Sequence, residues 1–399
     1  MNITIVYQYF GTPKGSWSTR IYELSRRWVG EGHELTVITS PYPKSDIKTS
    51  KFIEYLEIEG IKVIVINTPD NNKKSIANRI YNSLLFSVFS TYYLLKTPSD
   101  IVIASSGPIT VGIPALINKI FNRINYVFEV RDLWPRGAQE LGLIKKKLLL
   151  KIGFWIEKIF YEKSVLVVTA SVGQQLDIIN RFPFLKTINV SNACDIKMFE
   201  TVNENYKLPH WALGKSIFLH TGSIGLMNDC IQIIDAAKWI KSNVKNSNIL
   251  IVFIGDGSER LNLENAVEEN NIEFVKFLGL VPKIELVNWV NACSATLLTS
   301  ANFPVLDTIS PNKLFDSFAA GKPIIQTTEG WIKEFITNEE CGINVKNSNP
   351  KEMGNSILKL SLDDDYVSYL SKNAKRVAFE YFDRNKLAKY YIDEILKVV

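Results

Sequence analysis

One stretch of this chain, residues 311–325, reads PNKLFDSFAAGKPII. Its apolar residues recur with helical spacing, and Gly321 and Pro323 end the helix before a short β-branched run. We therefore predict a loop, a helix and a buried strand in succession. The same order also fits a plain βαβ unit in which Ala319, Ala320 and Gly321 serve only close packing.

The start of this predicted helix is suited to an anionic ligand. The amino end of a helix offers free backbone N–H groups and positive partial charge, which favour a diphosphate. Lys313 would add a cation there. Asp316 lies one turn further along, where its carboxylate could accept hydrogen bonds from ribose hydroxyls.

Strand and helix patterns continue on both sides of this stretch. Short β-branched runs that do not alternate with polar residues are typical of strands buried on both faces. In the second half of the chain we predict strands at Ile217–His220, Ile249–Ile254, Glu273–Phe277, Ala295–Leu298 and Pro323–Ile325. Helices are predicted between them, for example at Ile231–Lys241 and Leu286–Ala292.

The first half of the chain has the same alternation. Its predicted strands are Ile3–Tyr7, Leu35–Thr39, Ile61–Ile66, Ile101–Ala104 and Tyr126–Val130, with a helix at Ser18–Glu31. Repeated strand-helix-strand order predicts a parallel, right-handed, doubly wound sheet. Because 399 residues exceed one ordinary core, we predict an α/β protein with two Rossmann-like domains. They are expected to face a central cleft and to bind ligand beside the carboxyl ends of their strands.

The predicted domain boundary lies in a polar, irregular segment. We take Asn189–Leu213 as the linker, with a first domain at residues 1–195 and a second at residues 210–382. The last helix, residues 384–399, is predicted to pack back on the first domain.

Composition narrows the functional classes. A net charge of +5 lacks the dense basic stripe of dedicated nucleic-acid binders, so we predict no nucleic-acid partner. Phosphorylated ligands and an anionic membrane surface both fit this charge. The four cysteines form no CxxC pair and there are only three histidines, so we predict no metal site and no cofactor.

Cysteine usage and the apolar runs bear on location. Four scattered cysteines favour a reduced, cytoplasmic compartment. Met1–Tyr7 reads as a first strand rather than a signal peptide. The sequence has no run of about 20 apolar residues, so we predict no transmembrane helix.

Residues 308–325 resemble the signature helix of the retaining glycosyltransferases of family 4, which have the GT-B architecture. That family typically has Glu, seven residues, Glu, and then Ala-x-Gly-x-Pro. Asp316 matches the second carboxylate, so the resemblance implies that it binds the donor ribose, with Lys313 and Leu314 beside it. The resemblance to the family runs from Met1 to about Phe382. Five segments occur in the order and spacing of the family, which makes the resemblance specific.

The first carboxylate of the family signature is absent. Its position falls on Thr308, next to Asp307. In the family that Glu contacts the sugar ring. The resemblance therefore implies that Thr308, Asp307 or backbone groups at Ile309 and Ser310 substitute for it.

Residues 128–135, FEVRDLWP, follow a predicted strand at the expected cleft edge. Arg131 and Asp132 could meet sugar hydroxyls or phosphate, or could simply pair with each other. The run resembles a branch of family 4 that builds bacterial capsule and O-antigen chains, including N-acetyl-L-fucosamine transferases. Many family members have His before the Asp, where this chain has Arg131. We predict both residues as catalytic, with Asp132 as an acceptor-side polar group.

The loop after the first strand is glycine-containing. Residues 9–20 include Gly15 and Arg20, and glycine lets the backbone approach a ligand closely. The family has a comparable loop near the donor phosphate and the acceptor, which implies that Gly15 and Arg20 bind donor. A simple turn is the alternative.

Two further loops complete the predicted donor site. Residues 220–225 place Gly222, Ser223 and Gly225 where the family binds donor phosphates, but no cation follows them. Phosphate charge would then be met by backbone N–H groups, Lys313 or Arg260. Residues 253–260 resemble the nucleotide turn of the family, with Gly255 and Arg260 as donor-binding residues. Arg260 is otherwise a solvated helix charge.

A basic amphipathic segment lies at residues 141–163. Its lysines are Lys145, Lys146, Lys147, Lys151, Lys158 and Lys163, and its apolar residues include Leu148, Leu149, Ile152 and Trp155. Basic amphipathic helices with Trp are typical of anionic membrane surfaces. A second apolar stretch is Leu84–Leu95. The alternative is that both are core-facing helices with solvated lysines.

With these features, the family resemblance implies a retaining, metal-independent glycosyltransferase. By resemblance its donor is a UDP-linked sugar, with UDP-N-acetyl-L-fucosamine as one candidate. Its predicted acceptor is a lipid-pyrophosphate-linked saccharide, handled by a cytoplasmic enzyme that is peripheral on the cell membrane. The alternatives are a catalytically weak nucleotide-sugar-binding partner and a GT-B 2-epimerase, which would need cleft carboxylates and histidines. A Rossmann dehydrogenase is disfavoured because no GxGxxG follows the first strand.

Overall fold

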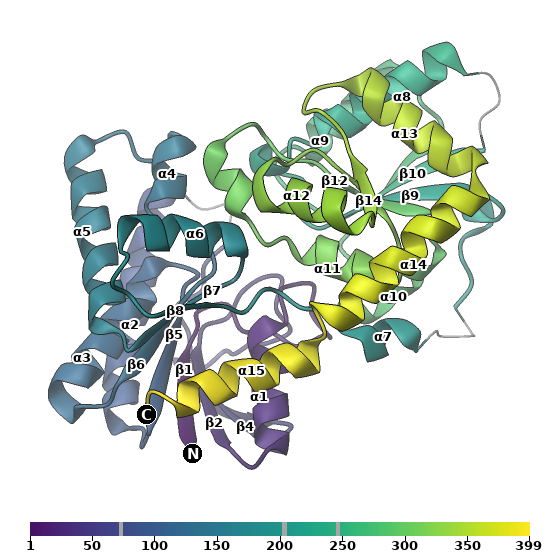
Figure 1. Cartoon of the computed structure of the whole chain (residues 1–399). Coiled ribbons are helices and arrows are strands. Elements are labelled where there is room, and N and C mark those ends of the chain that lie inside the picture. The colour runs from purple at the N-terminus through teal and green to yellow at the C-terminus, as the bar shows by residue number, and fades with distance from the viewer. Residues whose placement is uncertain (72–74, 202–205, 245–247) are drawn as a thin grey trace. The chain divides into compact units, whose positions relative to one another are not determined.

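The computed structural model describes residues 1–71, 75–201, 206–244 and 248–399 and divides into two compact units (Figure 1). Unit 1 comprises Met1–Asn192, Thr308–Ser310 and Asn385–Val399. Unit 2 comprises Ala193–Asp307 and Pro311–Arg384. Each unit is built on one sheet with helices on its faces.

Unit 1 has an eight-stranded sheet in the order β3-β4-β2-β1-β5-β6-β7-β8. Its strands are β1 (Asn2–Val6), β2 (Glu34–Thr39), β3 (Ile53–Ile58), β4 (Ile61–Ile66), β5 (Ile101–Ser105), β6 (Tyr126–Val130), β7 (Leu166–Thr169) and β8 (Thr187–Asn189). All neighbours pair in parallel except β3, which is antiparallel to β4. Glu59 and Gly60 form the turn between them with φ of 50° and 78°, the left-handed pair that a two-residue hairpin of type I′ requires.

Helices cover both faces of this sheet. They are α1 (Arg20–Gly30), α2 (Ile76–Lys96), η1 (Ile109–Val111), α3 (Gly112–Asn122), α4 (Arg136–Glu140), α5 (Lys147–Lys163), α6 (Val172–Arg181) and α15 (Arg384–Leu396). From Asn385 on, α15 belongs to unit 1 and lies beside α1 (Figure 1). There Trp28 meets Tyr391 edge to face, and its indole N–H donates to the carbonyl of Ala388 at 3.0 Å. The C-terminal helix therefore completes the core of unit 1.

Unit 2 has a six-stranded, fully parallel sheet in the order β11-β10-β9-β12-β13-β14. Its strands are β9 (Ser216–Thr221), β10 (Ile249–Ile254), β11 (Val275–Gly279), β12 (Ala295–Leu298), β13 (Ile324–Gln326) and β14 (Gly342–Asn344). Numbered within the unit, the order is 3-2-1-4-5-6, that of the doubly wound dinucleotide-binding sheet. The strand order reverses between β9 and β12, and ligands bind outside the carboxyl ends of strands at such a point.

The helices of unit 2 follow its strands. They are α7 (Ile196–Glu200), η2 (His210–Ala212), η3 (Leu226–Asn228), α8 (Ile231–Asn243), α9 (Arg260–Glu269), α10 (Lys283–Ala292), η4 (Pro304–Thr308), α11 (Asn312–Ala319), α12 (Gly330–Glu339), α13 (Pro350–Leu362) and α14 (Asp364–Glu380). α8 and α13 pack on the same face of the sheet (Figure 1) and share a core with residues of β10. Among the described helices of the whole chain, none is long and apolar enough to cross a bilayer.

The segment expected to be an irregular linker, Asn189–Leu213, is more ordered than its polar composition indicated. Cys194 forms a parallel bridge with Asp383, and α7 and η2 follow. Burial of Ile196 and Phe199 explains why so short a helix as α7 holds. Residues 202–205 of the predicted linker lie outside the described residues.

Candidate functional site

The switch point of unit 2 brings together three segments from distant parts of the chain. β9 leads into the loop at residues 222–225, and β10 leads into Gly255. β12 is followed by residues 299–311, and α11 begins at Asn312. Parallel strands end at the same sheet edge, so these loops gather where a ligand is expected to bind.

Close backbone contact between two of these loops requires glycine. A Cβ on Gly255 would lie 1.7 Å from the carbonyl oxygen of Gly222, which no side chain can occupy. Gly222 has a φ of 102°, in the region that favours glycine. Its amide donates to the carbonyl of Ile254 at 2.8 Å. Within the described part of the chain, the amide groups of Ser223 and Gly225 donate to no other group, so they are available to a ligand.

Lys313 is buried beside this loop. Lys313 is 8% exposed. A Cβ on Gly222 would lie 3.8 Å from Cε of Lys313, so the aliphatic part of the lysine passes along the loop backbone. Burial lowers the pKa of Lys313 to about 8. Among the described residues no carboxylate lies within ion-pair distance of its ammonium group. A buried cation without an acid partner is unfavourable unless an anion joins it.

His220 is the polar partner of Lys313. Its Nε2 lies 3.2 Å from the Nζ of Lys313, and the residue is fully buried. Burial, together with the charge of Lys313, lowers the pKa of His220 well below its ordinary value, while hydrogen bonding to the backbone at Ser223 and Leu297 partly offsets this. The imidazole is therefore neutral. Cys230 approaches the same Nε2 at 3.4 Å, and burial raises the pKa of its thiol to about 11.

Asp316 lies one turn after Lys313 and is occupied by a cation. Its carboxylate forms an ion pair with Lys283 at the start of α10, and both side chains are largely buried. Leu314, between Lys313 and Asp316 in α11, is fully buried. The pair fixes the orientation of Asp316, and a ribose hydroxyl could reach it only by sharing or displacing Lys283.

Arg260 opens α9 and pairs with Glu264 one turn later at 2.8 Å. Its guanidinium also lies near Gly279, since a Cβ there would be 3.1 Å from Nη1. Because Gly279 ends β11, the Arg260 guanidinium lies at the carboxyl end of that strand, where it could contact a phosphate or a base. The ion pair with Glu264 equally fits the alternative of a solvated helix charge.

Arg131 and Asp132 follow β6 at the carboxyl edge of the sheet in unit 1. Arg131 donates to the Ser18 hydroxyl at 2.9 Å and lies over the Tyr7 ring, 4.9 Å from its centroid. No ion pair joins Arg131 to Asp132 in the described residues, and Asp132 is exposed. The Nη1 group of Arg131 is buried with no hydrogen-bond partner among them.

Arg20 has a structural environment in unit 1. It is 3% exposed, forms an ion pair with Glu129 at 2.9 Å, and donates to the carbonyls of Val190 and Ser191 at 2.7 Å each. Burial acts to raise the pKa of Glu129, but Arg20, Arg131 and Ser105 together hold it below its ordinary value. The guanidinium joins α1, β6 and the end of β8.

The loop at Gly15 packs against the chain at residues 44–46. A Cβ on Gly15 would lie 2.9 Å from both the Asp46 amide nitrogen and the Lys44 carbonyl oxygen. Thr12 is tied to the same segment, because its hydroxyl donates to the Asp46 carboxylate at 2.7 Å. Close packing alone accounts for glycine at this position.

Thr308 and Ser310 belong to unit 1, whereas the other predicted donor residues from Gly222 to Asp316 belong to unit 2. The Ser171 hydroxyl donates to the Thr308 carbonyl at 2.5 Å, and the Asn192 amide donates to the Ser310 carbonyl at 2.6 Å. Both contacts use backbone carbonyls of the segment, and the Ser310 hydroxyl also accepts from the backbone N–H of Asn192 at 3.4 Å.

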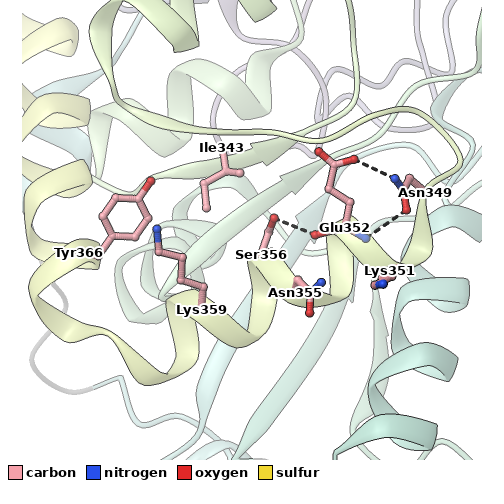
Figure 2. A pocket seen from close by; sticks show the side chains of 8 residues that line it. All are labelled: Ile343, Asn349, Lys351, Glu352, Asn355, Ser356, Lys359 and Tyr366. Carbon is pink, nitrogen blue, oxygen red and sulfur yellow. Dashed lines mark hydrogen bonds between the residues drawn. The ribbon is translucent and has the colours of Figure 1, made fainter.

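A cavity of about 420 Å³ lies elsewhere on unit 2 (Figure 2). It is lined by residues of β14, α13 and the start of α14 and contains no predicted donor residue. Asn349 caps α13 by accepting from the Glu352 amide at 3.2 Å, and the Lys359 ammonium lies 3.6 Å from the Tyr366 ring centroid. These polar groups are used within the helices, so we assign no ligand there.

Two residues of the site were not among the predicted donor residues. Lys283 lies three residues before the predicted helix Leu286–Ala292, and His220 ends the predicted strand Ile217–His220, and neither residue was assigned a role from the sequence. The sequence signal for His220 was its place at the end of a strand. No pattern linked Lys283 to Asp316, which lies 33 residues away.

Comparison with known proteins relates this chain to glycosyltransferases. Residues 204–377 match the family model "Glycosyl transferases group 1". The chain is 24% identical over 361 residues to the Pseudomonas aeruginosa protein named "Probable glycosyltransferase WbjE", covering 86% of this chain and 84% of that one.

Solved structures share the fold across the whole chain. A sucrose-phosphate synthase from Thermosynechococcus elongatus superposes with a TM-score of 0.77 at 16% identity, covering 99% of this chain and 98% of the other. Anabaena HepE in complex with UDP and glucose has a TM-score of 0.71 at 17% identity, covering 100% and 99%. The chain therefore has the GT-B fold. Residues 204–377, nearly all within unit 2, carry the signature of the group 1 glycosyltransferases, and this is the class of enzyme that the findings support.

Proposed function

We propose that the protein transfers a sugar from a UDP-linked donor to a lipid-linked saccharide acceptor, with retention of anomeric configuration and without a metal ion. Bacterial surface polysaccharide synthesis is the proposed setting. UDP-N-acetyl-L-fucosamine is the first donor to test, because the run from Val130 to Pro135 resembles enzymes that use it.

The buried Lys313 carries this proposal. It has no acid partner among the described residues, lies at the switch point of a nucleotide-binding sheet, and borders a loop whose Ser223 and Gly225 amides are free. A diphosphate supplies the missing anion and accepts hydrogen bonds from both kinds of donor. UDP is preferred to GDP because HepE, which shares the fold, was solved with UDP.

The proposed chemistry follows from the charge on the leaving group. Negative charge grows on the β-phosphate as the sugar departs, and Lys313 with the loop amides is preorganised to stabilise it. The acceptor hydroxyl would attack from the side of the departing phosphate, so retention needs no covalent nucleophile. Asp132, exposed beside Arg131 in unit 1, is proposed to contact the acceptor.

We propose further that α5 holds the enzyme on an anionic membrane, where a lipid-linked acceptor resides. Leu148, Ile152 and Trp155 lie on one face of α5 and are 70%, 43% and 62% exposed. Lys147 and Lys151 flank this face, and Lys145 and Lys146 precede it. Among the described residues these four lysines make no ion pair. Exposed apolar residues bordered by lysines match the chemistry of anionic headgroups over acyl chains.

A donor screen followed by a transfer assay tests the proposal. UDP- and GDP-linked sugars would be ranked by the thermal shift they produce, and the best donor incubated with lipid-linked saccharides. We expect a UDP-sugar to bind. Its sugar should be transferred to the acceptor with the same anomeric configuration as in the donor. Binding without transfer or hydrolysis across suitable acceptors would instead support a nucleotide-sugar-binding partner, a function that the Thr in place of the first signature Glu also favours.

A further inference from the structure

His220 and Lys313 are buried against each other at the switch point of unit 2. Nζ of Lys313 lies 3.2 Å from Nε2 of His220, whose ring packs on Phe253 with the centroids 5.4 Å apart. An ammonium group only donates hydrogen bonds, so Nε2 must accept, and the neutral imidazole carries its proton on Nδ1. The imidazole therefore fixes where the ammonium points.

The charged groups around Lys313 do not neutralise it. On its own helix the nearest acid is Asp316, which is paired with Lys283 of α10. Ahead of α8, Cys230 faces His220 as a neutral thiol, and the carboxylate of Asp229 accepts from the Gln232 side chain at 2.7 Å. Within the described residues, therefore, His220 is the polar side chain that holds the ammonium group.

We propose that His220 is a positioning residue that aims Lys313 at the donor diphosphate, and that diphosphate binding is coupled to proton uptake by Lys313. The inference rests on the proposed function only in taking the ligand to be a diphosphate. It assigns His220 a role through Lys313 rather than direct contact with the reacting atoms.

Proton uptake follows from the change in the surroundings of Lys313. In the empty site burial lowers the pKa of Lys313 to about 8. A bound diphosphate favours the charged amine and raises that pKa, so molecules with a neutral amine must take up a proton on binding. The expected uptake is about 0.2 proton at pH 7.5 and about 0.8 proton at pH 8.5. Affinity then falls with rising pH, by up to about tenfold per pH unit above pH 8.

The sign of the His220 effect also follows. Without an acceptor at Nε2, the ammonium loses its hydrogen bond and the pKa of Lys313 falls further. The midpoint of proton uptake therefore moves to lower pH. A side chain that keeps an acceptor there restores the midpoint.

The experiment is calorimetric titration of UDP into the full chain between pH 7.5 and 9.5, carried out at each pH in two buffers that both buffer there and differ in their heat of ionisation. The difference in heat between the two buffers gives the protons taken up. We expect the uptake curve above for the native chain, no uptake for Lys313→Met, and about tenfold weaker UDP binding for His220→Leu with its uptake midpoint shifted down. His220→Gln keeps an acceptor, so its affinity and midpoint should stay near native.

Several results would overturn the inference. One is UDP binding by the native chain with no proton uptake at pH 8.5, which leaves the donor assignment standing. Another is His220→Leu with affinity within twofold of native and an unshifted midpoint. Thermal unfolding checks that His220→Leu folds, and if it does not, His220→Gln with a midpoint far from native overturns the inference instead. A native chain that binds neither UDP nor GDP overturns the proposed function itself.

Discussion

Replacing Lys313 by Met is expected to weaken donor binding and stabilise the empty protein at the same time. The substitution keeps the unbranched chain that passes Gly222 and removes only the charged end. A hydrogen bond to a charged group contributes about 1.5 to 3 kcal/mol. UDP affinity at pH 7 should therefore fall by roughly 10- to 150-fold.

The stability effect has the opposite sign. The pKa of Lys313 is lowered from 10.5 to about 8, so its charged form is disfavoured in the folded state. Below pH 8 this costs the folded state about 3 kcal/mol, and the cost disappears as pH rises from 8 toward 10.5. Leaving Nε2 of His220 without a donor costs about 1 kcal/mol in return. The net gain for Lys313→Met is about 2 kcal/mol at pH 7, a rise of roughly 4 to 8 °C in the Tm of unit 2.

Differential scanning calorimetry at pH 7 and pH 10, with UDP titrations in parallel, measures both effects. Lys238→Met is a suitable control, because Lys238 forms an ordinary surface pair with Asp235 on α8 of the same unit. Its UDP affinity should not change. A Lys313→Met variant that binds UDP as tightly as the native chain would refute the diphosphate contact. One that loses affinity and stability together would show that Lys313 is a structural residue.

Three further predictions address other parts of the molecule. Asp316→Ala should weaken UDP binding at least tenfold, since it removes the proposed ribose acceptor and releases Lys283; unchanged donor affinity and turnover would place the ribose elsewhere. Gly255→Ala should destabilise unit 2 by about 1 to 3 kcal/mol, because its Cβ would meet the Gly222 carbonyl, and its melting temperature can be compared with that of Gly225→Ala, which meets no atom within 4 Å. Lys147→Gln with Lys151→Gln should reduce binding to phosphatidylglycerol vesicles about 30-fold in flotation assays, at about 1 kcal/mol per lysine. Leu261→Glu, a similarly exposed apolar site on α9, should leave vesicle binding unchanged, and equal binding by the lysine variant would contradict docking through α5.

The central strands were predictable because they are buried on both faces and leave continuous apolar runs in the sequence. The strands that were missed lie mainly toward the sheet edges. β3, at the sheet edge, exposes Tyr55 and Glu57 and has no continuous apolar run, and β8 and β14 have only three residues each. Such segments are stabilised by pairing with a neighbour rather than by their own composition. The first strand of the chain, by contrast, was placed within one residue.

The candidate site was predictable only where a motif marked it. The helix start marked Lys313 and Asp316, and the loops marked Gly222 and Gly255. Their partners could not be read from the sequence, because His220 lies 93 residues from Lys313. Arg20 shows the same limit, since its partner Glu129 is 109 residues away and its burial depends on the folded sheet. Local sequence thus indicates which groups are available, while tertiary packing sets their charge and orientation.

A crystal structure of the chain with bound UDP decides the donor-site assignment. We predict a β-phosphate oxygen within about 3 Å of Nζ of Lys313, the loop amides of Ser223 and Gly225 on the diphosphate, and the ribose at Asp316. A nucleotide bound away from the carboxyl ends of β9 and β12, or bound with Lys313 turned from its phosphates, would contradict the assignment.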